Sequence, residues 1–243
     1  RALVVSLVPS RVRENPSLMT MWTMVSSTSC EATKSGVPPT GKRGASSLSN
    51  TPIIELFTFD CEVFAYDWLF VFKHKATGEY TVIHNDNDAI WQFLREQPLL
   101  CGFNNKAYDN FILKAVAADC TPQEVKALSD YLIDGGQGWQ HPLMRDNPVF
   151  VTSFDIRDDM YEGLSLKACE GHLGMSVVES SVPFDLDRPL TDEELDETIF
   201  YCKHDVDATE RLVELRQSYL QTKINLGRRV GISDEKALSC TNA

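Results

Sequence analysis

The chain has 243 residues, 43% of them hydrophobic, so it is long enough to bury a sizeable core. Its formal charge of −12 argues against a protein that grips nucleic acid over a large surface, but it suits a metal site made of clustered carboxylates. The seven dispersed cysteines form no CxxC pair, which indicates a reducing compartment with neither a disulfide framework nor a zinc site.

Residues 1–50 differ from the rest of the chain. They are rich in Ser, Thr and Pro and contain six basic and two acidic residues, a formal charge of +4, so that residues 51–243 carry −16. Such a composition is typical of a disordered leader, which is the interpretation we favour, and a transit peptide is the alternative.

After residue 50 the pattern alternates between strands and helices. In chain order we expect a strand over 53–64, a hairpin over 67–85 that turns at Gly78, a helix over 88–97, a short buried strand over 99–104, helices over 106–119 and 121–136, a strand over 147–156, and a long helix that opens near 190 and includes 197–216. Thr121 with Glu124, and Thr191 with Glu194, fit capping boxes at two helix starts. Antiparallel strands come first and helices interleave afterwards, which predicts an α/β domain with a mixed sheet.

Two carboxylates lie close together on the first predicted strand, in the segment FDCE. Asp60 and Glu62 are two residues apart, so in a strand they point to the same face. They repel each other and are costly to desolvate, and a divalent cation removes both problems. The alternative is a strand end whose acids simply reach water.

Two further groups combine an acid with a neighbouring phenol. The first group, Asn105, Tyr108 and Asp109, spans the junction of a strand and a helix. Asp109 lies in the first helical turn, where the positive end of the helix dipole favours its negative charge. Tyr201 and Asp205 are four residues apart and share one helical face. The structural alternatives are helix capping for the first group, and a half-buried Tyr201 beside a solvated Asp205 for the second.

Taken in order, these three groups resemble the exonuclease motifs of the DEDD superfamily of 3′→5′ exonucleases. Tyr201 marks the tyrosine branch, found in proofreading domains of DNA polymerases, because the histidine branch has a His where this chain has Phe200. Residues 162–206 look like the equivalent stretch of phage-type DNA polymerases, and residues 236–243 look like the segment that leads into the polymerase part. The resemblance covers residues 51–243.

The resemblance implies an α/β fold of the ribonuclease H-like type, a mixed β-sheet flanked by helices. It places the exonuclease domain at residues 51–220 and the start of a linker towards an absent polymerase domain at 221–243. It also implies two Mg²⁺ or Mn²⁺ ions held by four acids. Asp60 would bridge both ions, Glu62 and Asp205 would complete the nucleophile-side ion, Asp109 would help to hold the second, and Tyr201 would orient the attacking water.

Candidate nucleic-acid contacts lie near these motifs. They are Phe64, Phe103, Asn105, Lys167 and Lys203, each of which could instead be core, capping or plainly solvated. His204 is interpreted as a surface residue with a phosphate contact. A small basic patch of Lys223, Arg228 and Arg229 follows near the C-terminus, where it could line a path for DNA or decorate a linker.

The function expected on this resemblance is proofreading hydrolysis of single-stranded DNA 3′ ends, next to the polymerase domain of a longer phage-type protein in the cytoplasm. No membrane contact is expected, because no apolar run approaches the ~20 residues of a membrane span. The alternatives are an exoribonuclease of the RNase D kind, a non-catalytic nucleic-acid-binding module, and a glycosidase built on paired acids.

Overall fold

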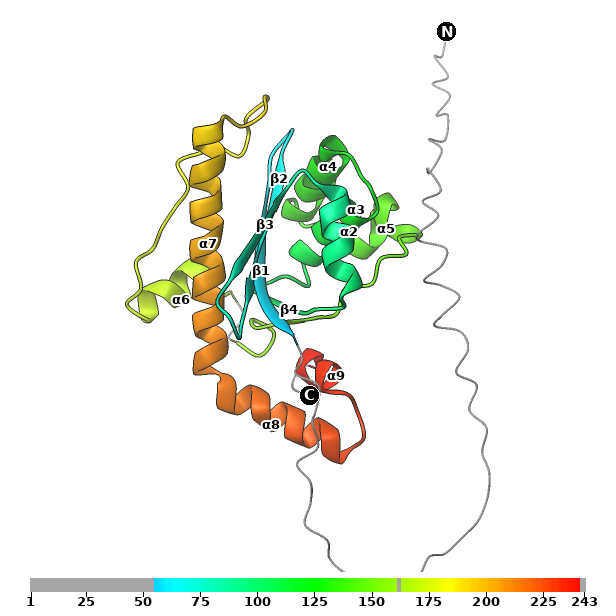
Figure 1. Ribbon diagram of the computed structural model, residues 1–243, viewed down its shortest axis with the longest axis vertical. Helices are drawn as coiled ribbons and strands as arrows, with labels where there is room; N and C mark the ends of the chain where they lie inside the picture. The colour runs from blue at the N-terminus through cyan, green and yellow to red at the C-terminus, as the bar shows by residue number, and fades with distance from the viewer. Residues whose placement is uncertain (1–54, 161–162, 241–243) are drawn as a thin grey trace, which may run out of the picture. The chain divides into compact units, whose positions relative to one another are not determined.

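The computed structural model describes residues 55–160 and 163–240 (Figure 1). The leader expected over residues 1–50 and the first two residues of the expected strand lie outside the described residues. Within the described ranges, no helix is both long enough and apolar enough to cross a membrane.

A five-stranded mixed sheet forms the centre of the domain, in the order β3-β2-β1-β4-β5. Its strands are β1 (Leu56–Val63), β2 (Trp68–His74), β3 (Tyr80–His84), β4 (Leu99–Gly102) and β5 (Ser153–Asp155). The first three pair antiparallel, whereas β4 lies parallel to β1 and β5 lies parallel to β4. The predicted hairpin is confirmed, with Gly78 in its turn at φ +73°, a conformation that glycine adopts without a steric cost.

The two faces of β1 differ in chemistry because successive side chains point to opposite sides. Phe59, Cys61 and Val63 join the main core together with Phe70 and Phe72 of β2. On the other face, Asp60 and Glu62 lie across from two apolar residues of β2, Val71 and Leu69 respectively.

Helices cover the apolar face of the sheet, as Figure 1 shows. They are α2 (Asn87–Arg95), α3 (Asp109–Ala117), α4 (Pro122–Ile133) and α5 (Pro142–Arg145), with a short 3₁₀ helix at Gly138–Gln140. The predicted capping box at the start of α4 is present, with the Thr121 hydroxyl accepting from the Glu124 N–H and the Glu124 carboxylate accepting from the Thr121 N–H. α5 and the 3₁₀ helix were not predicted from the sequence.

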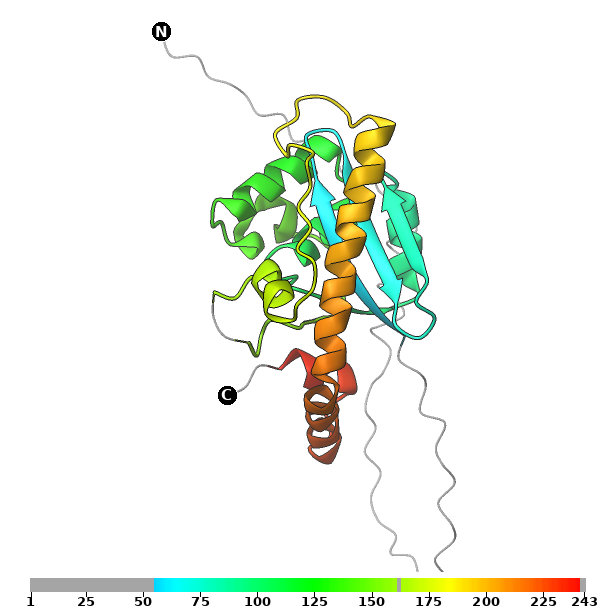
Figure 2. The same ribbon diagram turned by 90° about the vertical axis from the view of Figure 1, so that its left-hand side faces the viewer.

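A single long helix, α7 (Asp192–Leu215), crosses the opposite face of the sheet (Figure 2). It starts at the predicted capping box of Thr191 and Glu194. Cys202 and Val206 of α7 pack on Leu69 and Val71 of β2 in a buried apolar cluster. This packing fixes the helix against the face of the sheet that carries Asp60 and Glu62.

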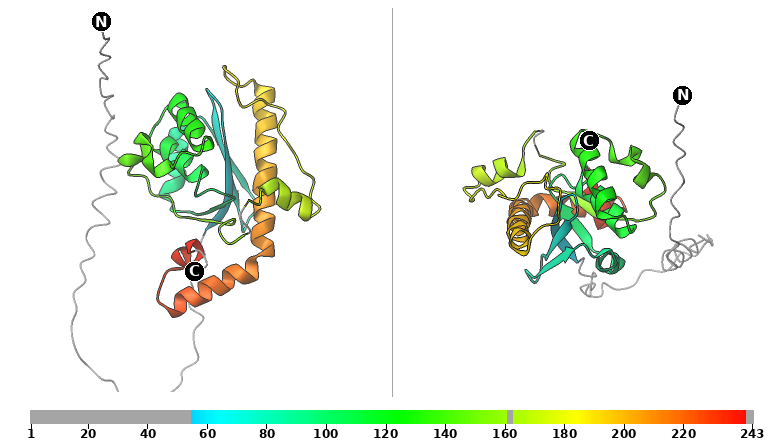
Figure 3. Two further views of the ribbon diagram at one scale, coloured as in Figure 1. Left: turned by 180° about the vertical axis from the view of Figure 1, so that it is seen from behind. Right: turned by 90° about the horizontal axis from the view of Figure 1, so that it is seen from above.

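Three further helices complete the described chain: α6 (Leu166–His172), α8 (Gln217–Arg229) and α9 (Asp234–Ser239). Most of the described part of the linker expected over 221–243 lies in α8 and α9, and Figure 3 shows α8 turning away from the lower end of α7. Leu238 of α9 is buried in a cluster with Leu212 of α7 and Phe154 of β5. The domain is therefore α/β, with a mixed sheet between a group of helices and the long helix α7.

Candidate metal centre

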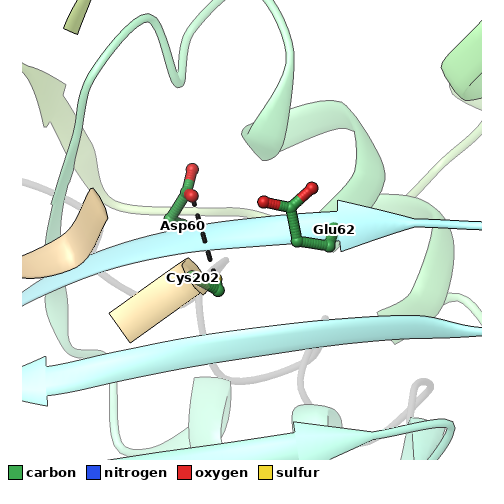
Figure 4. Close-up of side chains that lie close together, drawn as sticks. All are labelled: Asp60, Glu62 and Cys202. Carbon is green, nitrogen blue, oxygen red and sulfur yellow. Dashed lines mark hydrogen bonds between the residues drawn. The ribbon is translucent and has the colours of Figure 1, made fainter. Parts of the chain in front are cut away.

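Asp60 and Glu62 are the two acids of β1 on the side facing α7. Figure 4 shows both carboxyl groups rising from the same side of the strand. Both residues are half-buried. Their position confirms the expectation, from their spacing of two, that they share one face.

α7 brings Tyr201, Cys202 and Asp205 to the same region. The Cys202 Sγ lies 3.8 Å from the Asp60 Oδ2, as the dashed line in Figure 4 marks. The nearest ligand atoms of Asp60, Glu62 and Cys202 all lie within 4.8 Å of one another. Asp205 is buried, with 6% of its surface exposed, so it is not the solvated residue of the structural alternative.

Asp109 enters the site from the first turn of α3, as the sequence predicted. Its side chain is buried, and its Oδ1 accepts a hydrogen bond of 3.1 Å from the Cys61 Sγ. Cys61 was not singled out from the sequence. The alternation of β1 places it on the core side, and there it supports an acid from a different element.

The carboxyl groups influence one another electrostatically. Burial, followed by the charges of Asp109, Glu62 and Asp205, raises the pKa of Asp60 well above its usual range. Burial and then the charges of Asp205 and Asp109 raise the pKa of Glu62 to about 8. Burial raises the pKa of Asp109 to about 6. Acids from β1, α3 and α7 therefore form one cluster in which full ionisation is unfavourable unless cations are bound.

Tyr201 presents its hydroxyl to the same cluster. Burial, and then the charges of Asp205 and Glu62, raise the pKa of the Tyr201 phenol. The hydroxyl is therefore protonated at neutral pH and is available as a hydrogen-bond donor.

Lys167 of α6 is the cation that the structure places in this cluster. Its Nζ lies 2.5 Å from the Asp205 Oδ1 and 4.7 Å from the centre of the Tyr201 ring. A second acid, Glu170 of α6, lies 3.6 Å from the same ammonium group. Lys167 and Lys203 were the two lysines predicted to touch phosphate. Of these, Lys167 lies beside Asp205 and Glu170.

The other predicted nucleic-acid contacts lie in different surroundings. Phe64 is fully buried and stacks on Phe184 at 5.2 Å between ring centres, which makes it a core residue in this structure. Phe103 is half-buried under the Arg157 guanidinium. Lys203 lies over the Tyr80 ring of β3, with its Nζ 5.2 Å from the ring centre.

Asn105 is fully buried in the loop between β4 and α3. Its Nδ2 donates to the Asn110 Oδ1 at 3.2 Å, whereas its Oδ1 accepts no hydrogen bond from the described residues. The loop is held by Asp155, whose carboxylate accepts from the backbone N–H groups of Asn104, Lys106 and Arg157. An acid between the apolar residues Phe154 and Ile156 was the available signal for this role.

His204, expected at the surface, is half-buried and turned towards an acid. Only 18% of its side chain is exposed, and its Nε2 lies 3.4 Å from the Glu170 Oε1. Its place on α7 next to Asp205 turns the imidazole towards α6. Two members of the predicted basic patch are already paired, Lys223 with Asp159 and Arg228 with Asp234.

Within the described ranges, two groups of side chains have ligand atoms close enough to hold a cation. The first is Asp60, Glu62 and Cys202, and the second is Glu170, His204 and Asp205. No protein-family model matches this chain, and no curated protein matches it either.

Proposed function

We propose that this chain carries a metal-dependent 3′→5′ exonuclease domain that removes nucleotides from single-stranded DNA ends. The observation that supports the proposal is the electrostatic influence of Asp109 and Asp205 on Asp60 and Glu62, which brings together four acids from the three segments that resemble the exonuclease motifs. The strand order, with three antiparallel strands followed by two parallel ones, supports a ribonuclease H-like arrangement. By the same resemblance, the domain proofreads for a DNA polymerase in a longer chain.

The chemistry of the donor set fits a pair of Mg²⁺ or Mn²⁺ ions. All four proposed ligands offer carboxylate oxygens, which hard divalent cations prefer. When bound, two such ions activate a water molecule and stabilise the leaving oxygen of a phosphodiester. The crowding of the acids supports the same conclusion, because dications relieve the repulsion that raises the pKa of Asp60 and Glu62.

The position of each residue indicates its role in the proposed reaction. Asp60 interacts with all three of the other acids, which suits a ligand shared by both ions. Tyr201 is protonated and neighbours Asp205, so its hydroxyl can hydrogen-bond the attacking water and orient it. A phenol with a raised pKa does not deprotonate that water.

Release of a 3′-terminal label from single-stranded DNA tests the proposal directly. We expect release with Mg²⁺ and none with EDTA, and a 5′ label should be released only after the 3′ label. An RNA strand of the same sequence separates DNA from RNA preference, and faster release from RNA would favour the RNase D-like alternative.

Two aspartates of α7 provide a matched pair of variants. Asp205→Asn removes a proposed ligand, and we expect a loss of more than about 100-fold, since even outer partners of metal ligands are worth 10–100-fold. Asp207→Asn removes a carboxylate of the same helix that pairs with Lys73 instead, and it should retain activity. Failure to release nucleotides with any divalent cation would favour a non-catalytic binding module.

A further inference from the structure

Glu170 of α6 is a buried acid that the proposed exonuclease centre does not use. Its side chain is fully buried, yet neither of its oxygens accepts a hydrogen bond from any residue that the structure describes. Its nearest polar neighbours are the His204 Nε2 at 3.4 Å and the Lys167 Nζ at 3.6 Å. Burial of a carboxylate without hydrogen bonds is costly, so this group needs a stronger partner than it has.

His204 faces Glu170 and likewise has a buried polar atom without a hydrogen-bond partner in the described part of the chain. Its Nε2 is buried and has no hydrogen-bond partner among the described residues. The separation of 3.4 Å between the Nε2 and the Glu170 Oε1 is long for a hydrogen bond. Two ligand atoms that each lie about 2.1 Å from a tetrahedral cation are about 3.4 Å apart, whereas neighbouring ligand atoms of an octahedral cation are about 3.0 Å apart. The observed separation therefore matches the tetrahedral arrangement.

We propose that Glu170, His204 and Asp205 bind one transition-metal cation of the Zn²⁺ type, at a site that shares Asp205 with the proposed exonuclease centre and includes neither acid of β1. The ligand atoms of all three lie within 4.8 Å of one another. An imidazole nitrogen with two carboxylate oxygens selects Zn²⁺ over Mg²⁺, because Mg²⁺ prefers oxygen ligands alone. The cysteine spacing, which argued against zinc, has no bearing on this site because no cysteine takes part.

Lys167 shows that this space already suits a positive charge. Its ammonium group bonds to Asp205 and neighbours Glu170, so it lies between two of the three ligands. A bound cation takes that place, and Lys167 turns outwards, since 27% of its side chain is already exposed. The inference goes beyond the proposed nuclease activity and does not require it, although both sites use Asp205.

Binding of Zn²⁺ alone, measured by calorimetry in excess Mg²⁺, tests the site. We expect one bound Zn²⁺ per chain, with the affinity lowered at least about tenfold in His204→Gln and in Glu170→Gln. His172→Gln is the matched control, because His172 lies on α6 at an exposed position outside the cluster. Asp60→Asn should keep its Zn²⁺, because Asp60 is not one of the three proposed ligands.

The ¹⁵N signal of the His204 Nε2 in the unmodified chain gives a second measurement that does not depend on the folding of a variant. It should shift on addition of Zn²⁺ and stay in place with Mg²⁺. An unshifted signal, or His204→Gln with the Zn²⁺ affinity of the original chain, overturns the site and leaves a structural charge cluster. Neither result depends on nucleotide release, so the failure of one proposal is distinguishable from the failure of the other.

Discussion

Replacement of Glu62 by Gln should stabilise the metal-free domain while it removes a proposed metal ligand. In the folded chain, burial and the neighbouring acids raise the pKa of Glu62 from 4.5 to about 8. Below the lower value the carboxyl group is protonated in both the folded and the unfolded state. As pH rises towards the higher value, the unfolded chain releases the proton first, so the folded state loses stability.

The magnitude follows from the same two pKa values. Each tenfold difference in proton affinity changes the free energy of unfolding by about 1.4 kcal/mol. Ionisation of Glu62 therefore lowers the free energy of unfolding near neutral pH by about 3 kcal/mol relative to an acidic solution. Part of this loss comes from repulsion by Asp205 and Asp109, which can relax in other ways. We therefore expect Glu62→Gln to raise the free energy of unfolding by about 2 kcal/mol. For a domain of this size that is a rise in Tm of about 4–8 °C.

Thermal unfolding followed by circular dichroism in EDTA, at about pH 5 and about pH 8, measures the effect. The unmodified chain should lose stability between the two pH values, and Glu62→Gln should lose less. Glu79→Gln, at an exposed position in the hairpin turn, is the control and should change stability by less than about 0.5 kcal/mol. A Glu62→Gln variant that melts no higher than the original chain at the upper pH would refute the electrostatic reasoning. Added Mg²⁺ should stabilise the original chain more than the variant.

Three further substitutions test other parts of the structure. Tyr201→Phe should lose less nuclease activity than Asp205→Ala in single-turnover assays, because a phenol that orients water contributes less than a metal ligand; equal losses would count against that role. Asp155→Ala should destabilise the domain by about 2–4 kcal/mol in urea unfolding, since three backbone N–H groups lose their acceptor, and an unchanged midpoint would contradict this. Gly227→Ala places a Cβ 2.5 Å from the Cβ of Ala237, so we expect about 1–3 kcal/mol of destabilisation and faster hydrogen exchange in α9; a more stable variant would show that helix propensity outweighs this overlap.

The elements that were predictable from the sequence are those with strong local signals. Thr121 and Thr191 each stand three residues before a glutamate, and both capping boxes form, because the reciprocal hydrogen bonds involve only neighbouring residues. The shared face of Asp60 and Glu62 was likewise predictable, since alternation in a strand follows from backbone geometry.

Features that depend on contacts between distant segments were not predictable. The inward turn of His204 depends on Glu170 of α6, a helix that the sequence pattern did not reveal. The contact of Cys61 with Asp109 joins β1 to the start of α3, and no local pattern pairs them. The resemblance implied a linker over 221–243, whereas α8 and α9 cover most of its described part, and Leu238 of α9 packs in a cluster with residues of α7 and β5.

The attachment of α7 to the sheet has a consequence for how the centre tolerates change. Cys202 and Val206 are locked into the apolar layer on β2, while Tyr201 and Asp205 project from the same turns of the helix. The positions of Tyr201 and Asp205 relative to the sheet are therefore set when the chain folds. A substitution at Val206 that repacks this layer will therefore alter the spacing between the acids of β1 and α7 without replacing any of them.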